Sequence, residues 1–145
     1  MRALTLIRPW SWAILYGGKD VENRTWSPPR DMIGQTIAIH AGKKLDKDAM
    51  DAVFVLSGDV KIPEGDERWS RVDDQGIVGV ARIRDVVTRS DSPWFDGPVG
   101  WCLDMVIALP TPIQCRGSLG LWTMTESLAA EVREALRESR DGRRE

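Results

Sequence analysis

The chain has 145 residues, of which 42% are hydrophobic and 29% are charged, and its formal net charge is −2 at pH 7. This length fits one domain with its own core, and no run of about 18 apolar residues occurs, so no membrane helix is expected. One histidine and two well-separated cysteines, Cys102 and Cys115, do not form a zinc motif. We therefore expect no metal or other cofactor.

The charge is unevenly distributed along the chain. Residues 1–47 hold eight basic and four acidic side chains, for a net charge of +4, whereas residues 48–99 carry −5 and residues 100–145 carry −1. The first third of the chain can therefore form a basic face although the net charge of the whole protein is negative. Chance variation along a sequence also produces an uneven charge distribution. The excess of basic residues therefore indicates a binding face only if their side chains cluster in the folded protein.

Alternating apolar residues and helix end signals predict a mixed fold. Strands are expected near residues 2–8, 36–41, 76–87, 100–109 and 113–115, and helices near 9–16, 46–56 and 124–137. Asp46 is a candidate cap for the second helix, and Thr123 with Glu126 suggests a capping box for the third.

The remaining segments complete this domain prediction. Residues 57–75 are expected to form a long polar loop, and its Trp69 either packs against the core, as tryptophans more often do, or closes over a ligand. Residues 138–145 are expected to be a disordered polar tail. The sequence therefore predicts a single α+β domain over residues 1–137, with mostly antiparallel strands. Because Met1-Arg2 leads directly into the first strand without a signal-peptide pattern, we expect a cytoplasmic protein with reduced cysteines.

The segment from Gly17 to Arg24 concentrates charge where the first helix ends. A glycine pair stops the helix, and strand alternation then places Glu22 and Arg24 on the same side. Lys19 and Glu22 form the sharpest pair in the chain. A buried lysine can lose its proton and act as a base, and a carboxylate can transfer protons. The same two side chains can also form a salt bridge that fixes the turn.

Other side chains extend this candidate site. Arg8 and Arg24 are candidate clamps for phosphate or carboxylate, since a guanidinium offers a rigid fork of donors; a buried ion pair is the alternative. Trp10 and Trp12 are about 200° apart on the helix, so one is expected to pack inward while the other faces a cleft, where it could stack on a base.

A strand end supplies two further candidates. His40 ends a predicted strand just before Lys43, and both are candidate ligand-binding residues. A lone histidine is more often a structural residue, and that alternative stays open.

Several of these segments together resemble the ASCH domain, a family of the PUA-like superfamily. The residues that carry the resemblance are Leu4 to Trp12, the pattern G-x-K-x-x-E-x-R with Lys19, Glu22 and Arg24, Ile37 to Lys44, Trp94-Phe95, Gly100-Trp101, and Cys115 to Trp122. The resemblance covers about residues 2–124. It implies a mostly antiparallel PUA-like β-barrel with a cleft that binds RNA or a nucleotide-like molecule.

Amidohydrolases of the wider superfamily that remove the acyl group from N4-acetylcytidine also resemble the charged segment. Lys19 falls at their lysine, whereas Glu22 stands where their threonine nucleophile would be. The sequence thus favours binding of RNA or a nucleotide-like ligand through Lys19, Glu22 and Arg24. The alternatives are a hydrolase of a modified nucleoside or of RNA, with Lys19 and Glu22 in proton transfer, and a protein-interaction module.

Overall fold

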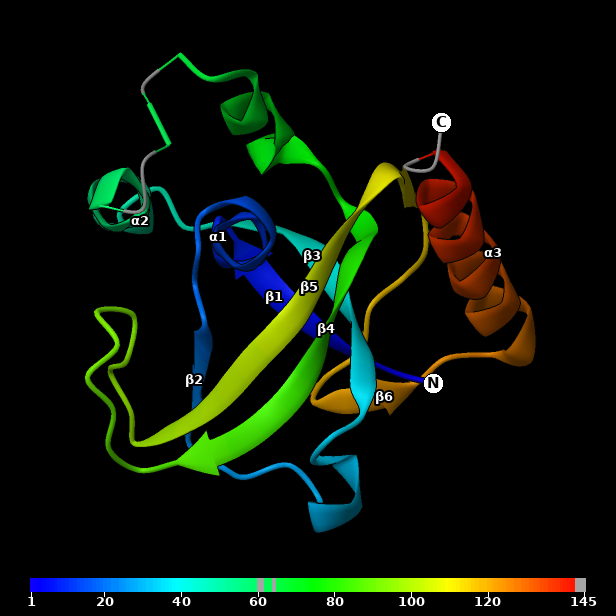
Figure 1. The fold of residues 1–145 in the computed structure, drawn as a ribbon, viewed down its shortest axis with the longest axis horizontal. Coiled ribbons are helices and arrows are strands. Elements are labelled where there is room, and N and C mark those ends of the chain that lie inside the picture. Colours follow the sequence, from blue (N-terminus) through cyan, green and yellow to red (C-terminus); the bar gives the residue numbers. More distant parts are fainter. Residues whose placement is uncertain (60–61, 64, 143–145) are drawn as a thin grey trace.

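Six strands form one sheet, and a computed structural model describes residues 1–59, 62–63 and 65–142 (Figure 1). The elements of these residues are β1 (Arg2–Arg8), α1 (Trp10–Tyr16), β2 (Val21–Arg24), a 3-10 helix (Arg30–Met32), β3 (Thr36–Leu45), α2 (Ala49–Asp59), a second 3-10 helix (Glu67–Asp73), β4 (Gly76–Val87), β5 (Val99–Ile113), β6 (Leu121–Thr123) and α3 (Glu126–Gly142). Within this described part, no helix is both long and apolar enough to cross a membrane.

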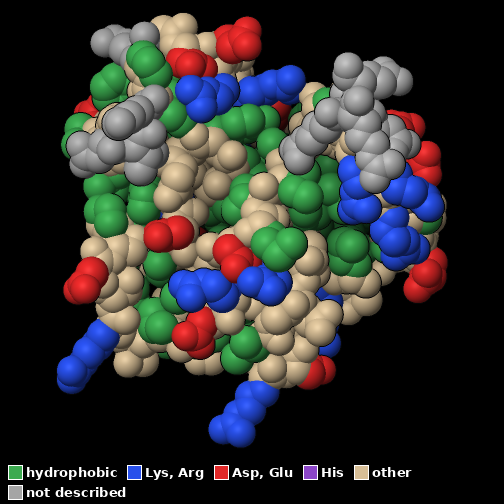
Figure 2. Space-filling model, in the orientation of Figure 1, with side chains coloured by type: hydrophobic (Ala, Val, Ile, Leu, Met, Phe, Trp, Pro, Cys, Tyr) green, Lys and Arg blue, Asp and Glu red, His purple; other side chains and the backbone are tan. Residues whose placement is uncertain are grey.

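The strand order is β2-β5-β4-β3-β1-β6, and β1 with β3 is the parallel pair. The other neighbouring pairs are antiparallel, and the long β4–β5 hairpin crosses the front of the view in Figure 1. The predicted α+β class with mostly antiparallel strands is therefore confirmed. The face seen in Figure 2 mixes acidic and basic side chains at close range.

The sheet is open, so the closed barrel that we expected is not found. Among the described residues, the edge strands β2 and β6 do not pair with each other. Both edges are short: β2 has four residues and pairs with the start of β5, and β6 has three residues and pairs with the start of β1. Instead of a backbone ladder, the Arg24 side chain reaches from β2 to the Thr5 carbonyl oxygen of β1, at 3.4 Å.

Both faces of the sheet are buried, as the strand alternation requires. Ile37 and Ile39 of β3 point into a core that also contains Ile14 of α1, whereas Ala38 between them points toward a core that contains Val132 of α3. A third cluster joins α1, α2 and the second 3-10 helix through Trp12 and Val53. Helices α1 and α3 therefore cover opposite faces of the sheet and hold its curvature.

Several boundaries differ from the predictions. Strand β3 continues to Leu45, β5 runs without a break to Ile113, and α3 extends to Gly142, into the predicted tail. The third helix is capped by Thr125, whose hydroxyl accepts from the Leu128 backbone N–H at 3.1 Å, because Thr123 belongs to β6. Residues 143–145 lie outside the described residues.

The predicted loop of residues 57–75 is partly ordered as helix. Helix α2 runs to Asp59 and a 3-10 helix spans Glu67–Asp73; residues 60–61 and 64 lie outside the described part. Trp69 stacks on Trp12 with ring centroids 4.0 Å apart, and its indole N–H donates to the Pro63 carbonyl oxygen at 3.0 Å. Trp69 therefore packs against the third cluster, which is the first of the two roles considered for it.

Candidate functional site

A cleft of about 960 Å³ occupies the gap where the sheet fails to close. It lies between the β2 edge and the strand β1, and the loop that precedes β6 forms part of its mouth. Its lining comes from separate parts of the chain: Thr5–Ile7, Trp10, Lys19, Glu22–Arg24, Gly42–Lys44, Ala52, Leu56, Pro93–Asp96 and Ser118–Gly120. The open edge of the sheet therefore also borders a concave site.

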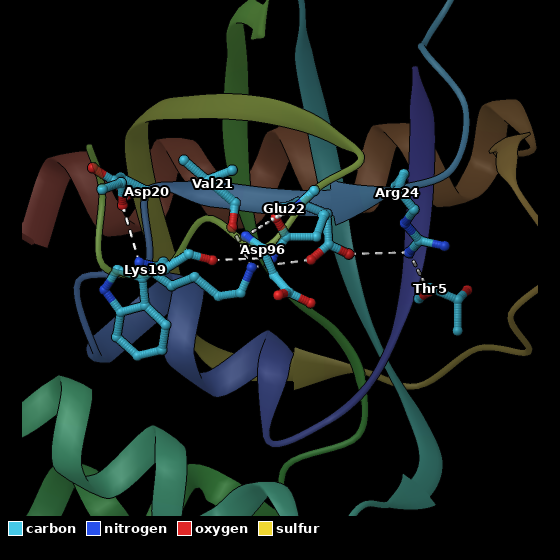
Figure 3. A network of polar contacts seen from close by, with 11 residues as sticks. Thr5, Lys19, Asp20, Val21, Glu22, Arg24 and Asp96 are labelled. Carbon is cyan, nitrogen blue, oxygen red and sulfur yellow. Dashed lines mark hydrogen bonds and ion pairs between the residues drawn. The ribbon is translucent and has the colours of Figure 1, made fainter. Parts of the chain in front are cut away.

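A buried ion network lies along one wall of this cleft (Figure 3). The Lys19 ammonium donates to the Val21 carbonyl oxygen and to Glu22 Oε1, the latter at 3.2 Å. The Arg24 Nη2 lies 3.2 Å from Glu22 Oε2. Lys19 is 3% exposed and Glu22 is 6% exposed, so one carboxylate is shared by two cations away from water.

Local sequence explains why Lys19 is placed there. Gly18 adopts a φ of 78°, which turns the chain directly after α1. The Lys19 backbone N–H then donates to the Ala13 carbonyl oxygen at 3.0 Å, and this bond ties the turn to the helix. From this position the lysine side chain runs along β2 and passes 5.7 Å from the centre of the Trp10 ring.

Burial and pairing act in opposite directions on Lys19. Burial is the larger effect and lowers the pKa of Lys19 below its ordinary value, because desolvation penalises the ammonium. The carboxylate of Glu22 works against this shift by stabilising the charged form. The wall therefore presents a desolvated amine that is more easily deprotonated than an ordinary lysine, held by a carboxylate at hydrogen-bond distance.

The rest of the cleft combines apolar walls with an exposed basic rim. Lys43 and Lys44 are exposed at the end of β3. Another part of the lining is an aromatic wall made of Phe95, which is half-buried, and Trp94, which is only 4% exposed, and Asp96 adds one carboxylate. Cations at the rim and aromatic groups inside are the two features that a nucleotide needs, since phosphate binds to cations and bases stack on rings.

Asn23 holds the aromatic wall in place, and the sequence reading missed it. Its side-chain amide donates to the Trp94 carbonyl oxygen at 3.0 Å, and its oxygen accepts from the backbone N–H groups of Asp96 and Gly97, at 2.8 and 3.0 Å. The signal was its place inside the charged segment, between Glu22 and Arg24. The loop that Asn23 contacts lies more than 70 residues later in the chain, so no local sequence pattern indicated these hydrogen bonds.

The structure brings five of the seven predicted site residues to this cleft: Trp10, Lys19, Glu22, Arg24 and Lys43. Trp12 is 2% exposed and packs inward while Trp10 faces the cleft, in line with their expected separation on α1. Glu22 and Arg24 lie on the same side of β2, since they share an ion pair.

The other two predicted residues lie behind the cleft walls. The Arg8 guanidinium is buried and donates to the carbonyl oxygens of Gly42 at 3.1 Å and Lys43 at 2.8 Å. The His40 Nε2 lies 3.0 Å from the Cys115 carbonyl oxygen, and the ring is 4% exposed. Both side chains therefore contact backbone segments that lead into the cleft lining.

The structure thus combines an open α+β sheet with a charged segment at its β2 edge and a cleft beside that segment. The chain belongs to the ASCH-domain family, because the family model described as ASCH domain matches residues 4–97. The matched part contains α1, the ion network, Lys43 and Lys44, and the aromatic wall. A similarity search among curated proteins found no match.

Proposed function

We propose that this protein binds RNA or a nucleotide-like ligand in the cleft between β1 and β2. The observation that carries the proposal is the coincidence, in one cavity, of the Lys19–Glu22–Arg24 network, an aromatic wall and the exposed cations Lys43 and Lys44. The volume of about 960 Å³ is within the usual range of small-ligand sites, about 300–1,000 Å³. We interpret the open sheet as a PUA-like barrel whose gap serves as the ligand entrance.

In this proposal, each part of the cleft has its own role. Lys43 and Lys44 are exposed and meet phosphate groups, whereas Trp10 or Phe95, both half-buried, supplies the surface on which a base stacks. Lys19 and Arg24 are already paired with Glu22, so they contribute fixed hydrogen-bond donors and shape more than net charge. The cleft has room for about one nucleotide unit, which favours single-stranded or unpaired segments.

The test compares two exposed lysines that differ in position relative to the cleft. Lys44→Ala should weaken binding of a fluorescein-labelled single-stranded RNA in an anisotropy titration and reduce the salt slope by about 0.7 to 1 unit, since one phosphate contact is lost. Lys47→Ala is the matched control, because Lys47 is also exposed and lies two residues beyond the end of β3. Equal effects of the two substitutions, or no RNA binding by the wild type, would refute the proposal.

A second function has one specific observation in its favour, the lowered pKa of the buried Lys19 amine. With glutamate at position 22, the nucleophile would be water, and neutral Lys19 would accept its proton as the water attacks an amide or phosphoryl group. This hydrolase would release product from an acetylated cytidine or from RNA, with a rate that rises with pH up to the pKa of Lys19. Chromatography of such reactions decides the matter: product that is formed by the wild type and lost in Lys19→Met would favour the enzyme.

A further inference from the structure

Leu119 is the most exposed large hydrophobic side chain among the described residues, at 99%. It lies between Ser118 and Gly120, and all three residues line the mouth of the cleft. A single exposed leucine is common on protein surfaces, so the position of Leu119 at the mouth of the cleft is the informative feature. Here it projects fully into solvent beside the candidate binding site, and the proposed function leaves it unexplained.

The loop that carries Leu119 is anchored on both sides. On the N-terminal side, the Cys115 carbonyl oxygen lies 3.0 Å from His40 Nε2, and Gly117 packs so closely that a Cβ there would lie 2.5 Å from Thr5 Oγ1. On the C-terminal side, Trp122 donates its indole N–H to the same Thr5 oxygen, at 3.0 Å. The loop therefore presents Leu119 from a fixed base, which gives the buried His40 a structural role.

The surroundings of Leu119 match a nucleic acid. Ile7, 45% exposed, also lines the mouth, and so do the exposed cations Lys43 and Lys44. Arg116, three residues before Leu119, is exposed as well. Nucleic-acid-binding proteins that unstack bases combine an apolar wedge with cations that hold the neighbouring phosphates. A protein partner would more commonly meet a broader apolar patch than two aliphatic side chains among cations.

We propose that the protein extracts one nucleotide from a base-stacked, double-helical nucleic acid, with Leu119 as the wedge that fills the vacated position. The inference rests on the proposed function, since the extruded nucleotide would enter the cleft. A cavity of about 960 Å³ holds one nucleotide but not a base-paired helix, so a duplex can use it only by releasing a nucleotide from the stack.

The test follows, by NMR, the imino proton signals of the stem base pairs of an RNA hairpin, because a base that leaves the helix loses its pairing wherever it then stacks. A DNA hairpin of the same sequence and a fluorescein-labelled RNA single strand are the other two arms. The wild type should remove the imino signal of one base pair in at least one hairpin. Leu119→Ala should preserve that signal and weaken hairpin binding about tenfold, or about 1.4 kcal/mol, with a clearly smaller loss for the single strand. Val55→Ala, an exposed aliphatic residue on α2, is the control and should change neither reading.

The outcomes separate this inference from the function on which it rests. If the single strand binds but neither hairpin loses an imino signal, extraction is wrong and the proposed function stands. If Leu119→Ala weakens single-strand and hairpin binding equally, Leu119 is an ordinary contact and the wedge is wrong. If the wild type binds no single strand, both the proposed function and the inference fall. The hairpin that loses an imino signal identifies RNA or DNA as the source of the nucleotide.

Discussion

Replacing Glu22 with glutamine removes the one negative charge shared by two cations without changing the shape of the side chain. The carboxylate lies 3.2 Å from both Lys19 Nζ and Arg24 Nη2. At this distance each pair attracts by about 5 kcal/mol with an effective dielectric constant of about 20, and the desolvation of the buried charges offsets much of that. Loss of one partner of a buried pair typically costs about 3–5 kcal/mol. We expect Glu22→Gln to lower the free energy of unfolding by that amount.

The assay is urea and thermal unfolding monitored by tryptophan fluorescence. A loss of about 3–5 kcal/mol should lower the melting temperature by roughly 10–15 °C for a chain of this size. The matched control is Glu134→Gln, since Glu134 pairs with Arg137 at 2.7 Å on the exposed face of α3. That change should cost less than about 0.5 kcal/mol. If the two substitutions cost the same, the buried network does not stabilise the β2 edge and the reasoning is wrong.

Two further predictions concern buried groups at the end of α1 and its following turn. Ser57 is fully buried against Gly17, and its hydroxyl has no hydrogen-bond partner among the described residues. Ser57→Ala should therefore raise the free energy of unfolding by about 1 kcal/mol in urea titrations. A loss of stability would show instead that the hydroxyl has a hydrogen-bond partner. Burial lowers the pKa of Lys19 from 10.5, so the unfolded chain binds a proton that the folded chain releases in the window just below 10.5. The contribution of Lys19 to the free energy of unfolding should therefore rise with pH in that window. Urea titrations should show this rise in the wild type but not in Lys19→Met. Identical pH profiles of the two proteins would contradict the prediction.

Local signals in the sequence predicted much of the fold. The first helix, bounded by Pro9 and Gly17, and the strand Gly76–Val87 were placed as they occur. The two strands predicted at residues 100–109 and 113–115 are joined in the structure, where β5 continues through Pro110 and Pro112 to Ile113. In the structure the two prolines fall where the register shifts, between the pairs Ile77–Ile113 and Gly79–Ala108, so the missing N–H groups interrupt pairing without ending the strand.

The candidate site was predictable only in the part that is local in sequence. Alternation along a strand predicts that Glu22 and Arg24 point to the same side of β2. The 3.6-residue repeat of a helix predicts that Trp10 and Trp12 point in different directions from α1. The aromatic wall held by Asn23 and the loop that carries Leu119 depend on contacts between distant segments, which no local period encodes. The nearby Lys43 suggests His40 as a ligand contact, whereas in the structure Gly117 packs directly against the His40 ring.

Binding in the cleft can be observed most directly through the seven tryptophan indole N–H signals in NMR spectra during titration with single-stranded RNA. Trp10 is half-buried and lines the cleft, whereas Trp26 and Trp101 pack on each other elsewhere, with ring centroids 4.9 Å apart. The proposed function predicts a saturable shift of the Trp10 signal and constant positions for Trp26 and Trp101. An unchanged Trp10 signal at RNA concentrations that saturate binding would contradict it.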